Sequence, residues 1–248
     1  MGKLLKAEFF KLSKSIEYKI LLAVCLAIGL LFGIMGIWYG SSTVGAKCVS
    51  ISGTGFLYNA VLISMFAAYY IGSEFENHTF AGEVACGASR GKLFGAKMIL
   101  YFIAILPLIM IYDWVTVAVF TVRNGFGMDW NLETAGFIVY KILFSILCNF
   151  AMGSYILLVV YLTRDKVRTV GVGVGSLYLL NQCCINERNP VLLKFWQYTF
   201  FYQIDCGRGL ERPMHFQVSF HVIVISSLVF ITGAVFFAAW KFKTYDLK

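Results

Sequence analysis

The sequence predicts an all-α, polytopic membrane protein with six transmembrane helices. Of its 248 residues, 59% are apolar and only 14% are charged, and the mean hydropathy is +0.76. Soluble domains are nearer half apolar and a quarter charged. Long stretches carry no charged residue at all, such as 20–46 and 48–73. Stretches of this kind are long enough to cross the hydrocarbon layer, which takes roughly 20 residues of helix.

Charge-free stretches also give the positions of the spans. The expected spans are 20–39, 56–71, 98–121, 135–161, 169–185 and 218–240, of which 169–185 is short and glycine-rich. Six spans of roughly 20 residues occupy about half of the chain. We therefore expect one transmembrane domain over 1–248, without a soluble catalytic domain.

The basic residues orient the chain. Most of the 21 lysines and arginines fall in segments 1–19, 72–97, 162–168 and 241–248. Cytoplasmic segments are enriched in these residues, so we expect both termini in the cytoplasm and the protein in the plasma membrane. The formal charge of +8 then reflects contact with anionic headgroups. Nucleic-acid binding is not expected, because it needs a solvated basic face.

Residues 3–16 have the pattern of an amphipathic helix. Leu5, Phe9, Leu12 and Ile16 recur at spacings of three and four, and the lysines lie largely off that stripe. Such a helix lies in the headgroup layer, within an N-terminal segment 1–19. The alternative is a simple extension of the first span.

Enzyme and metal motifs are absent. Gly82 and Gly87 have the spacing of a phosphate-binding loop, but Ala88 stands where that loop needs lysine. No Cys-x-x-Cys or His-Glu-x-x-His pattern occurs. We therefore expect no catalytic residue, no metal and no cofactor on this chain.

The most informative segment is 72–97, expected to lie in the cytoplasm. Glu74 and Glu76 precede a short helix predicted at 79–86, where acidic residues complement the helix dipole. Gly87 is suited to end that helix, and Ser89-Arg90 begins another that leads into the third span. An ordinary solvated loop is the alternative.

This segment resembles the loop after the second span in permease subunits of the ABC-2 family of ATP-binding cassette transporters. The resemblance rests on Glu74, Glu76, Thr79, Ser89, Arg90, Phe94 and Lys97. The amphipathic start and the six spans agree with it over nearly the whole chain. In size the chain is similar to the lantibiotic-immunity and bacitracin-resistance branches.

The resemblance implies that segment 72–97 forms a coupling helix that docks on an ATPase subunit. ATP and magnesium would be bound by that partner, and a second copy of this chain or a related one would complete the transporter. The residues expected to couple to the ATPase are Glu74, Glu76, Thr79, Phe80, Ser89, Arg90 and Phe94. The expected cargo is hydrophobic or amphipathic, such as an antimicrobial peptide. The alternative class is a secondary transporter or membrane-embedded enzyme that uses no ATPase.

The resemblance also implies short extracellular or re-entrant helices in segment 181–217, and a dimer interface built from the first and fifth spans. An interfacial belt of aromatic residues is compatible with the first feature. Two glycine pairs, Gly29 with Gly33 and Gly171 with Gly175, allow close helix approach and are candidates for the interface. Packing within one chain is the alternative.

Two further features depart from the family. Asp113 and Lys141 lie at similar depths in consecutive spans, so we expect a structural ion pair. A substrate contact by Asp113, or snorkelling to the headgroups, is the alternative. Four cysteines fall on the expected outer side, where Cys183 or Cys184 can pair with Cys206 or with Cys48.

Overall fold

The computed structural model describes residues 2–39, 42–51, 55–87, 89–206 and 220–244. Every regular element in these ranges is a helix, which confirms the all-α class. In chain order they are α1 (Gly2–Lys14), α2 (Ile16–Trp38), α3 (Gly45–Ile51), α4 (Phe56–Ala67), the π-helix η1 (Ala68–Gly72), α5 (Ser73–Glu76), α6 (Thr79–Ala85), α7 (Arg90–Asn124), α8 (Leu132–Thr163), α9 (Lys166–Ile185), α10 (Pro190–Trp196), α11 (Phe200–Cys206) and α12 (Phe220–Lys243).

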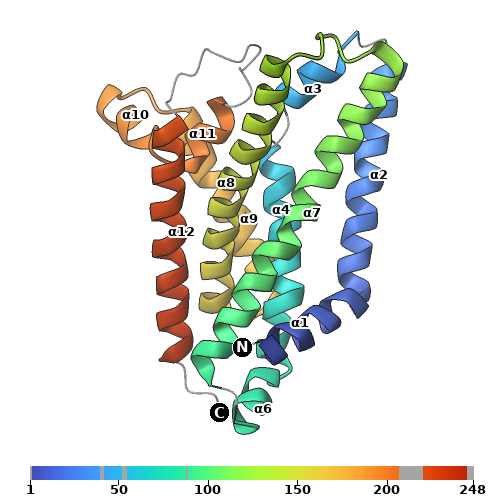
Figure 1. The fold of residues 1–248 in the computed structure, drawn as a ribbon. Helices are drawn as coiled ribbons and strands as arrows, with labels where there is room; N and C mark the ends of the chain where they lie inside the picture. The colour runs from blue at the N-terminus through green and yellow to red at the C-terminus, as the bar shows by residue number, and fades with distance from the viewer. Residues whose placement is uncertain (1, 40–41, 52–54, 88, 207–219, 245–248) are drawn as a thin grey trace.

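The long helices form a bundle of membrane-spanning length. Within the described ranges, five helical stretches are long and apolar enough to cross a membrane: Ile16–Trp38, Phe56–Glu76, Arg90–Asn124, Leu132–Thr163 and His221–Lys243. The helices α2 and α12 lie on opposite sides of the bundle (Figure 1). In each of them, only 22% of the residues in the apolar 18-residue stretch are buried. The central α4–α5 stretch is 67% buried. Apolar side chains on α2 and α12 are therefore placed to face lipid.

Helix α9 runs through the bundle but is not among those five. Arg168, Asn181 and Gln182 lower its hydropathy, and its 20 residues extend about 30 Å. The backbone N–H of Lys166 at its start donates to Glu76, while its other end packs against α11. Its inward face follows the spacing Thr169, Gly173, Leu177 and Asn181.

Short helices close the two ends of the bundle. Helices α1 and α6 lie at one end, and α3, α10 and α11 lie at the other (Figure 1). The end of α12 lies with α1 and α6, where the Arg90 guanidinium donates to the carbonyl of Lys243 at 3.1 Å. The two terminal helices therefore begin and end at the same end of the bundle.

The helix boundaries around segment 72–97 agree with those expected. Helix α7 begins at Arg90 after the N-cap Ser89 and continues through the buried Lys97 into the third span. Helix α6 coincides with the predicted short helix, and Gly87 follows it with a φ of +91°, a conformation that favours glycine. The short helix α3 was not expected, and it packs against the end of α7.

The face of α1 that packs on the bundle overlaps the predicted apolar stripe only in part, at Leu5 and Leu12. Glu8 and Leu12 are buried, whereas Phe9 is 58% exposed and Ile16 is 69% exposed. A charged residue takes the inward position because α7 presents an ammonium group there, as described below.

Segment 181–217 holds α10 and α11 as far as residue 206, and its remainder lies outside the described residues. Both helices lie at the end of the bundle opposite α6 (Figure 1). Pro190 begins α10, a position that proline favours. Phe195 and Val191 of α10 are exposed, while Phe200 and Phe201 of α11 are buried. The segment therefore combines exposed aromatic residues with short helices.

Candidate functional site

A buried ionic cluster joins three helices at the α6 end of the bundle. Lys97 of α7 is fully buried. Its Nζ lies 2.6 Å from Oε1 of Glu8, which comes from α1, and 2.6 Å from Oε2 of Glu74, which comes from α5. Burying an ammonium group without partners is costly, and close carboxylates offset that cost. Lys97 therefore fixes α1 and α5 against α7.

Neighbouring groups complete the shell of this cluster. The Tyr70 hydroxyl donates to Oε2 of Glu8 at 3.1 Å. The Lys97 ammonium also lies 5.2 Å from the centre of the Phe80 ring, within the range of a cation–π contact. Lys11 of α1 pairs with Oε1 of Glu74, so Glu74 bridges two lysines from different helices.

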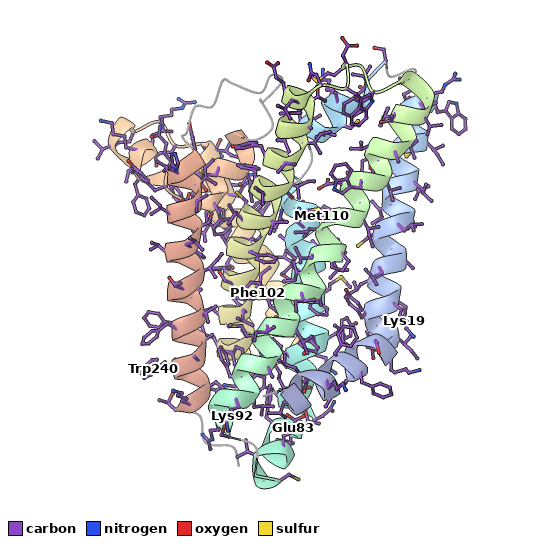
Figure 2. All side chains as sticks on the ribbon, in the orientation of Figure 1. Lys19, Glu83, Lys92, Phe102, Met110 and Trp240 are labelled. Atoms are coloured by element: carbon purple, nitrogen blue, oxygen red, sulfur yellow. The ribbon has the colours of Figure 1, made fainter. Side chains whose placement is uncertain are left out.

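A third carboxylate gives the cluster an excess of negative charge. Oε2 of Glu83 lies 3.9 Å from the Lys97 ammonium, and Figure 2 shows Glu83 beside α1 and α7. Burial raises the pKa of Glu83 against the opposing attraction of Lys97. Burial alone would lower the pKa of Lys11, but the carboxylate of Glu74 raises it overall.

The same three carboxylates are close enough to hold a cation. Oxygens of Glu8, Glu74 and Glu83 all lie within 4.8 Å of one another. The Lys97 ammonium lies among them and supplies the positive charge that a metal ion would otherwise bring. The arrangement fits an ionic lock between helices better than a metal centre.

Outside this cluster, the carboxylate of Glu76 connects α5 to α9. Oε1 of Glu76 accepts from the backbone N–H of Lys166 at 2.7 Å, and Oε2 lies 2.9 Å from the Lys166 ammonium. A carboxylate at a helix N-terminus satisfies a free N–H group and complements the dipole. Glu76 therefore holds the first turn of α9.

Aromatic side chains attach α6 to the bundle. The ring of Phe80 lies 4.6 Å from that of Phe75 and 5.1 Å from that of Phe242 on α12. Phe94 packs in the same group, with its ring centre 5.3 Å from that of Tyr161 on α8. Because α6 has only seven residues, it depends on such packing rather than on intrinsic helix stability.

The seven residues expected to couple to an ATPase thus take several positions. Glu74, Phe80 and Phe94 are buried within the chain, so their contribution is to hold α5 and α6 in place. The Thr79 hydroxyl donates to the carbonyl of Glu74 at 3.1 Å, and Ser89 is the N-cap of α7. Glu76 and Arg90 bind α9 and α12 respectively.

Sequence reasoning identified Glu74 and Lys97 but not the rest of the cluster. The lysines of segment 3–16, Lys11 among them, were placed largely off its apolar stripe, and Glu8 and Glu83 were not singled out. Only the tertiary contact of α1 with α7 brings Glu8 to Lys97. A signal was present in Glu8 itself, an acidic residue among lysines in segment 1–19.

The outer surface of α6 is the free side of this assembly. Thr79, Gly82 and Ala85 are exposed, and a Cβ built on Gly82 meets nothing within 4 Å. The exposed face of α6 at the end of the bundle therefore carries only small side chains.

The two glycine pairs have different surroundings. A Cβ on Gly29 would lie 3.0 Å from the carbonyl of Tyr112, and one on Gly33 only 2.7 Å from Val119. Both glycines therefore let α2 approach α7 within the chain, which is the alternative left open by the sequence. Gly171 and Gly175 have nothing within 4 Å, so an interface with another chain stays a prediction for α9.

Asp113 and Lys141 are both buried, with exposed fractions of 8% and 0%. They come from α7 and α8, which are in contact, and the carboxylate is close enough to act electrostatically on the ammonium. The Lys141 ammonium also lies 5.3 Å from the centre of the Phe144 ring. The ion pair between them stays a prediction.

Exchanging the two residues, in an Asp113→Lys and Lys141→Asp double variant, is expected to preserve folding and transport. Lys141→Met alone is expected to lose about 3 kcal/mol or more, because the buried carboxylate keeps no ammonium beside it. The measurement is the melting temperature of the detergent-solubilised chain, followed by transport. A folded exchange variant without transport would instead indicate a substrate contact at Asp113.

The predicted disulfide stays a prediction. Cys48 and Cys183 carry free thiols in the structure, and the side chain of Cys206 lies outside the described residues. Cys184 is buried on α9.

These features define a polytopic helical membrane protein in which ionic contacts hold α5 to α1, α7 and α9. The chain matches the family model described as "ABC-2 family transporter protein" over residues 4–180. Since this match covers more than half of the chain, the protein belongs to the ABC-2 transporter family. No curated protein matches the chain.

Proposed function

We propose that this chain is the transmembrane permease subunit of an ATP-driven ABC-2 transporter, with α6 as its coupling helix. The observation that carries this proposal is the double attachment of the α5–α6 segment. Glu74 joins it to α1 and α7, and Glu76 joins it to α9. Family membership supports the assignment.

The attachment suggests how a push on α6 reaches the membrane. Since α6 is short and packs on Phe75 and Phe242, it moves with α5 as a unit. The ionic contacts then carry the displacement to α1, α7 and α9 at the same end of the bundle. Bistable helix packing converts such shifts into alternate states of a transporter.

The partner is an ABC ATPase that binds ATP and magnesium, whereas this chain supplies no catalytic residue. A second copy of this chain, or a related permease, would complete the pathway, with the exposed glycine face of α9 as the candidate contact. The cargo is hydrophobic or amphipathic. A more specific hypothesis is that the cargo is an antimicrobial peptide, as in the immunity and bacitracin-resistance branches. The matching family model describes the ABC-2 family and not a branch of it. A secondary transporter or membrane-embedded enzyme is the rival class.

Gly82→Trp is expected to abolish association with the ATPase while the chain still inserts. The new side chain meets nothing within 4 Å in this chain, so it projects from α6 toward the partner. The measurement is co-purification of the ATPase with tagged permease from membranes. A loss of at least tenfold is expected, because an unaccommodated indole costs roughly 1.4 kcal/mol or more.

Gly136→Trp is the matched control. Gly136 is also an exposed helical glycine with nothing within 4 Å, but it lies near the start of α8, at the opposite end of the bundle. It is expected to retain normal association. If Gly82→Trp retained the ATPase as well as this control does, α6 would not be the docking element.

We further propose that α9 crosses the membrane as the fifth of six spans, with both chain termini in the cytoplasm and α1 in the cytoplasmic headgroup layer. Arg168→Cys and Arg188→Cys test the crossing in a chain whose seven native cysteines are all replaced by serine. An impermeant maleimide applied to intact cells is expected to label only position 188. Labelling of both positions from outside would contradict the crossing.

A further inference from the structure

A groove opens between the junction of α1 with α2, called the elbow below, and the helices α4, η1 and α5. Its volume is about 490 Å³, within the range of small-ligand sites. It lies beside the ionic cluster but uses largely different side chains. The lining comes from α1, α2, α4, η1, α5 and the first residue of α9.

The groove changes character from one side to the other. Leu21, Phe66 and Leu12 give it an apolar floor and are buried in the core. Its rim is polar, with Lys11, Lys14, Ser15, Glu17, Ser73, Asn77 and Lys166. A site that is apolar on one side and charged on the other suits an amphipathic ligand better than a free ion.

The charges on the rim are balanced except at the elbow. Lys11 pairs with Glu74, and Lys166 pairs with Glu76. Lys14 and Glu17 take part in no ion pair in the described part of the chain, although the Lys14 ammonium lies 5.8 Å from the centre of the exposed Phe10 ring and Lys166 acts electrostatically on Glu17. Glu17 accepts a hydrogen bond from the Ser15 hydroxyl at 2.8 Å, which fixes its position beside α2.

One cation and one acid that form no ion pair in the described residues therefore line an amphipathic groove. We propose that this groove binds the headgroup of a zwitterionic phospholipid, with the phosphate at Lys14 and the amine at Glu17. The first carbons of the lipid would then lie on the apolar floor at Leu21 and Phe66. A purely anionic headgroup matches the site less well, because Glu17 would repel it.

The position of the groove supports a lipid as the ligand. The groove lies where the amphipathic α1 meets the first span, and the adjoining surface of α2 exposes Ile16 and Ile20. A headgroup in the groove would brace the elbow against η1 and α9. This inference rests on membrane location and not on the proposed coupling to an ATPase.

The test is native mass spectrometry of the full-length chain, purified in mild detergent and supplied with defined lipids. Phosphatidylethanolamine is expected to bind more tightly than phosphatidylglycerol. Lys14→Gln and Glu17→Gln are each expected to weaken phosphatidylethanolamine binding about three- to fivefold, as expected for one exposed charged contact. Lys6→Gln, also exposed on α1 but outside the groove, is expected to change nothing.

The two variants also differ in what they predict for the anionic lipid. Glu17→Gln is expected to leave phosphatidylglycerol binding unchanged or strengthen it, while Lys14→Gln weakens it. Equal binding of both lipids by every variant would overturn the site. Tighter binding of phosphatidylglycerol by the unmodified chain would show that the groove selects an anion and would overturn the zwitterionic assignment.

Discussion

Replacing Lys97 by methionine is expected to destabilise the folded chain by about 3–5 kcal/mol, the usual cost of leaving buried charges without their partner. Glu8 and Glu74 would then face each other in the interior, each having lost a contact of 2.6 Å. Methionine retains most of the lysine volume, so the loss reflects charge rather than a cavity. The measurement is the melting temperature of the detergent-solubilised protein.

Two substitutions control this result. Lys92→Met changes an exposed lysine at the same end of α7 (Figure 2) and is expected to leave the melting temperature unchanged. Glu83→Gln is expected to maintain or raise it at neutral pH. Because burial raises the pKa of Glu83, the folded state favours its neutral form, and stability falls as the pH rises through that raised pKa. A Lys97→Met protein as stable as the parent would show that the lock is not formed.

Phe80→Ala is expected to release α6 from the bundle. Phe80 is 1% exposed, and deleting such a ring costs about 3–5 kcal/mol. A seven-residue helix does not persist without its anchor, so the loss is expected to be local. Hydrogen exchange is expected to rise across residues 77–87, to the level of an open loop, while α7 and α8 remain protected.

Phe237→Ala provides the comparison, because Phe237 is 57% exposed on α12. It removes the same ring from a lipid-facing position and is expected to leave exchange in α6 unaltered. If α6 stayed protected in Phe80→Ala, its attachment would depend on the ionic contacts rather than on the ring. Reduced ATPase association in Phe80→Ala would agree with the proposed coupling helix.

Long helices were largely predictable because hydrophobic length is a property of sequence alone. The absence of charge in 20–46 and 48–73 identified α2 and α4. The start of α7 at Arg90 was also predicted, although the expected apolar span began only after Lys97. Lys97 is fully buried, and its solvation comes from carboxylates far away in the chain, which local hydropathy does not report.

The candidate site was predictable only in part for the same reason. Glu74 and Glu76 were recognised in segment 72–97, but their partners were not. Lys97 belonged to the motif, yet Glu8 and Lys166 lie far from it in sequence and meet it only through the packing of α1 and α9. The spacing of Gly29 and Gly33 predicted that another helix approaches α2 closely. It did not identify that helix as α7 of the same chain.

The π-helix η1 has a consequence for comparing this chain with its relatives. In a π-helix the backbone hydrogen bonds span five residues instead of the four of an α-helix, so the turn at Ala68–Gly72 holds one extra residue. Each residue of an α-helix turns the chain by about 100°, so a relative lacking that residue would aim the position of Glu74 away from Lys97. A relative whose helix is regular through this stretch is therefore expected to align with a single-residue gap between Phe66 and Glu74. Chains with the gap are expected to have exchanged the acidic residue for one suited to a different neighbour.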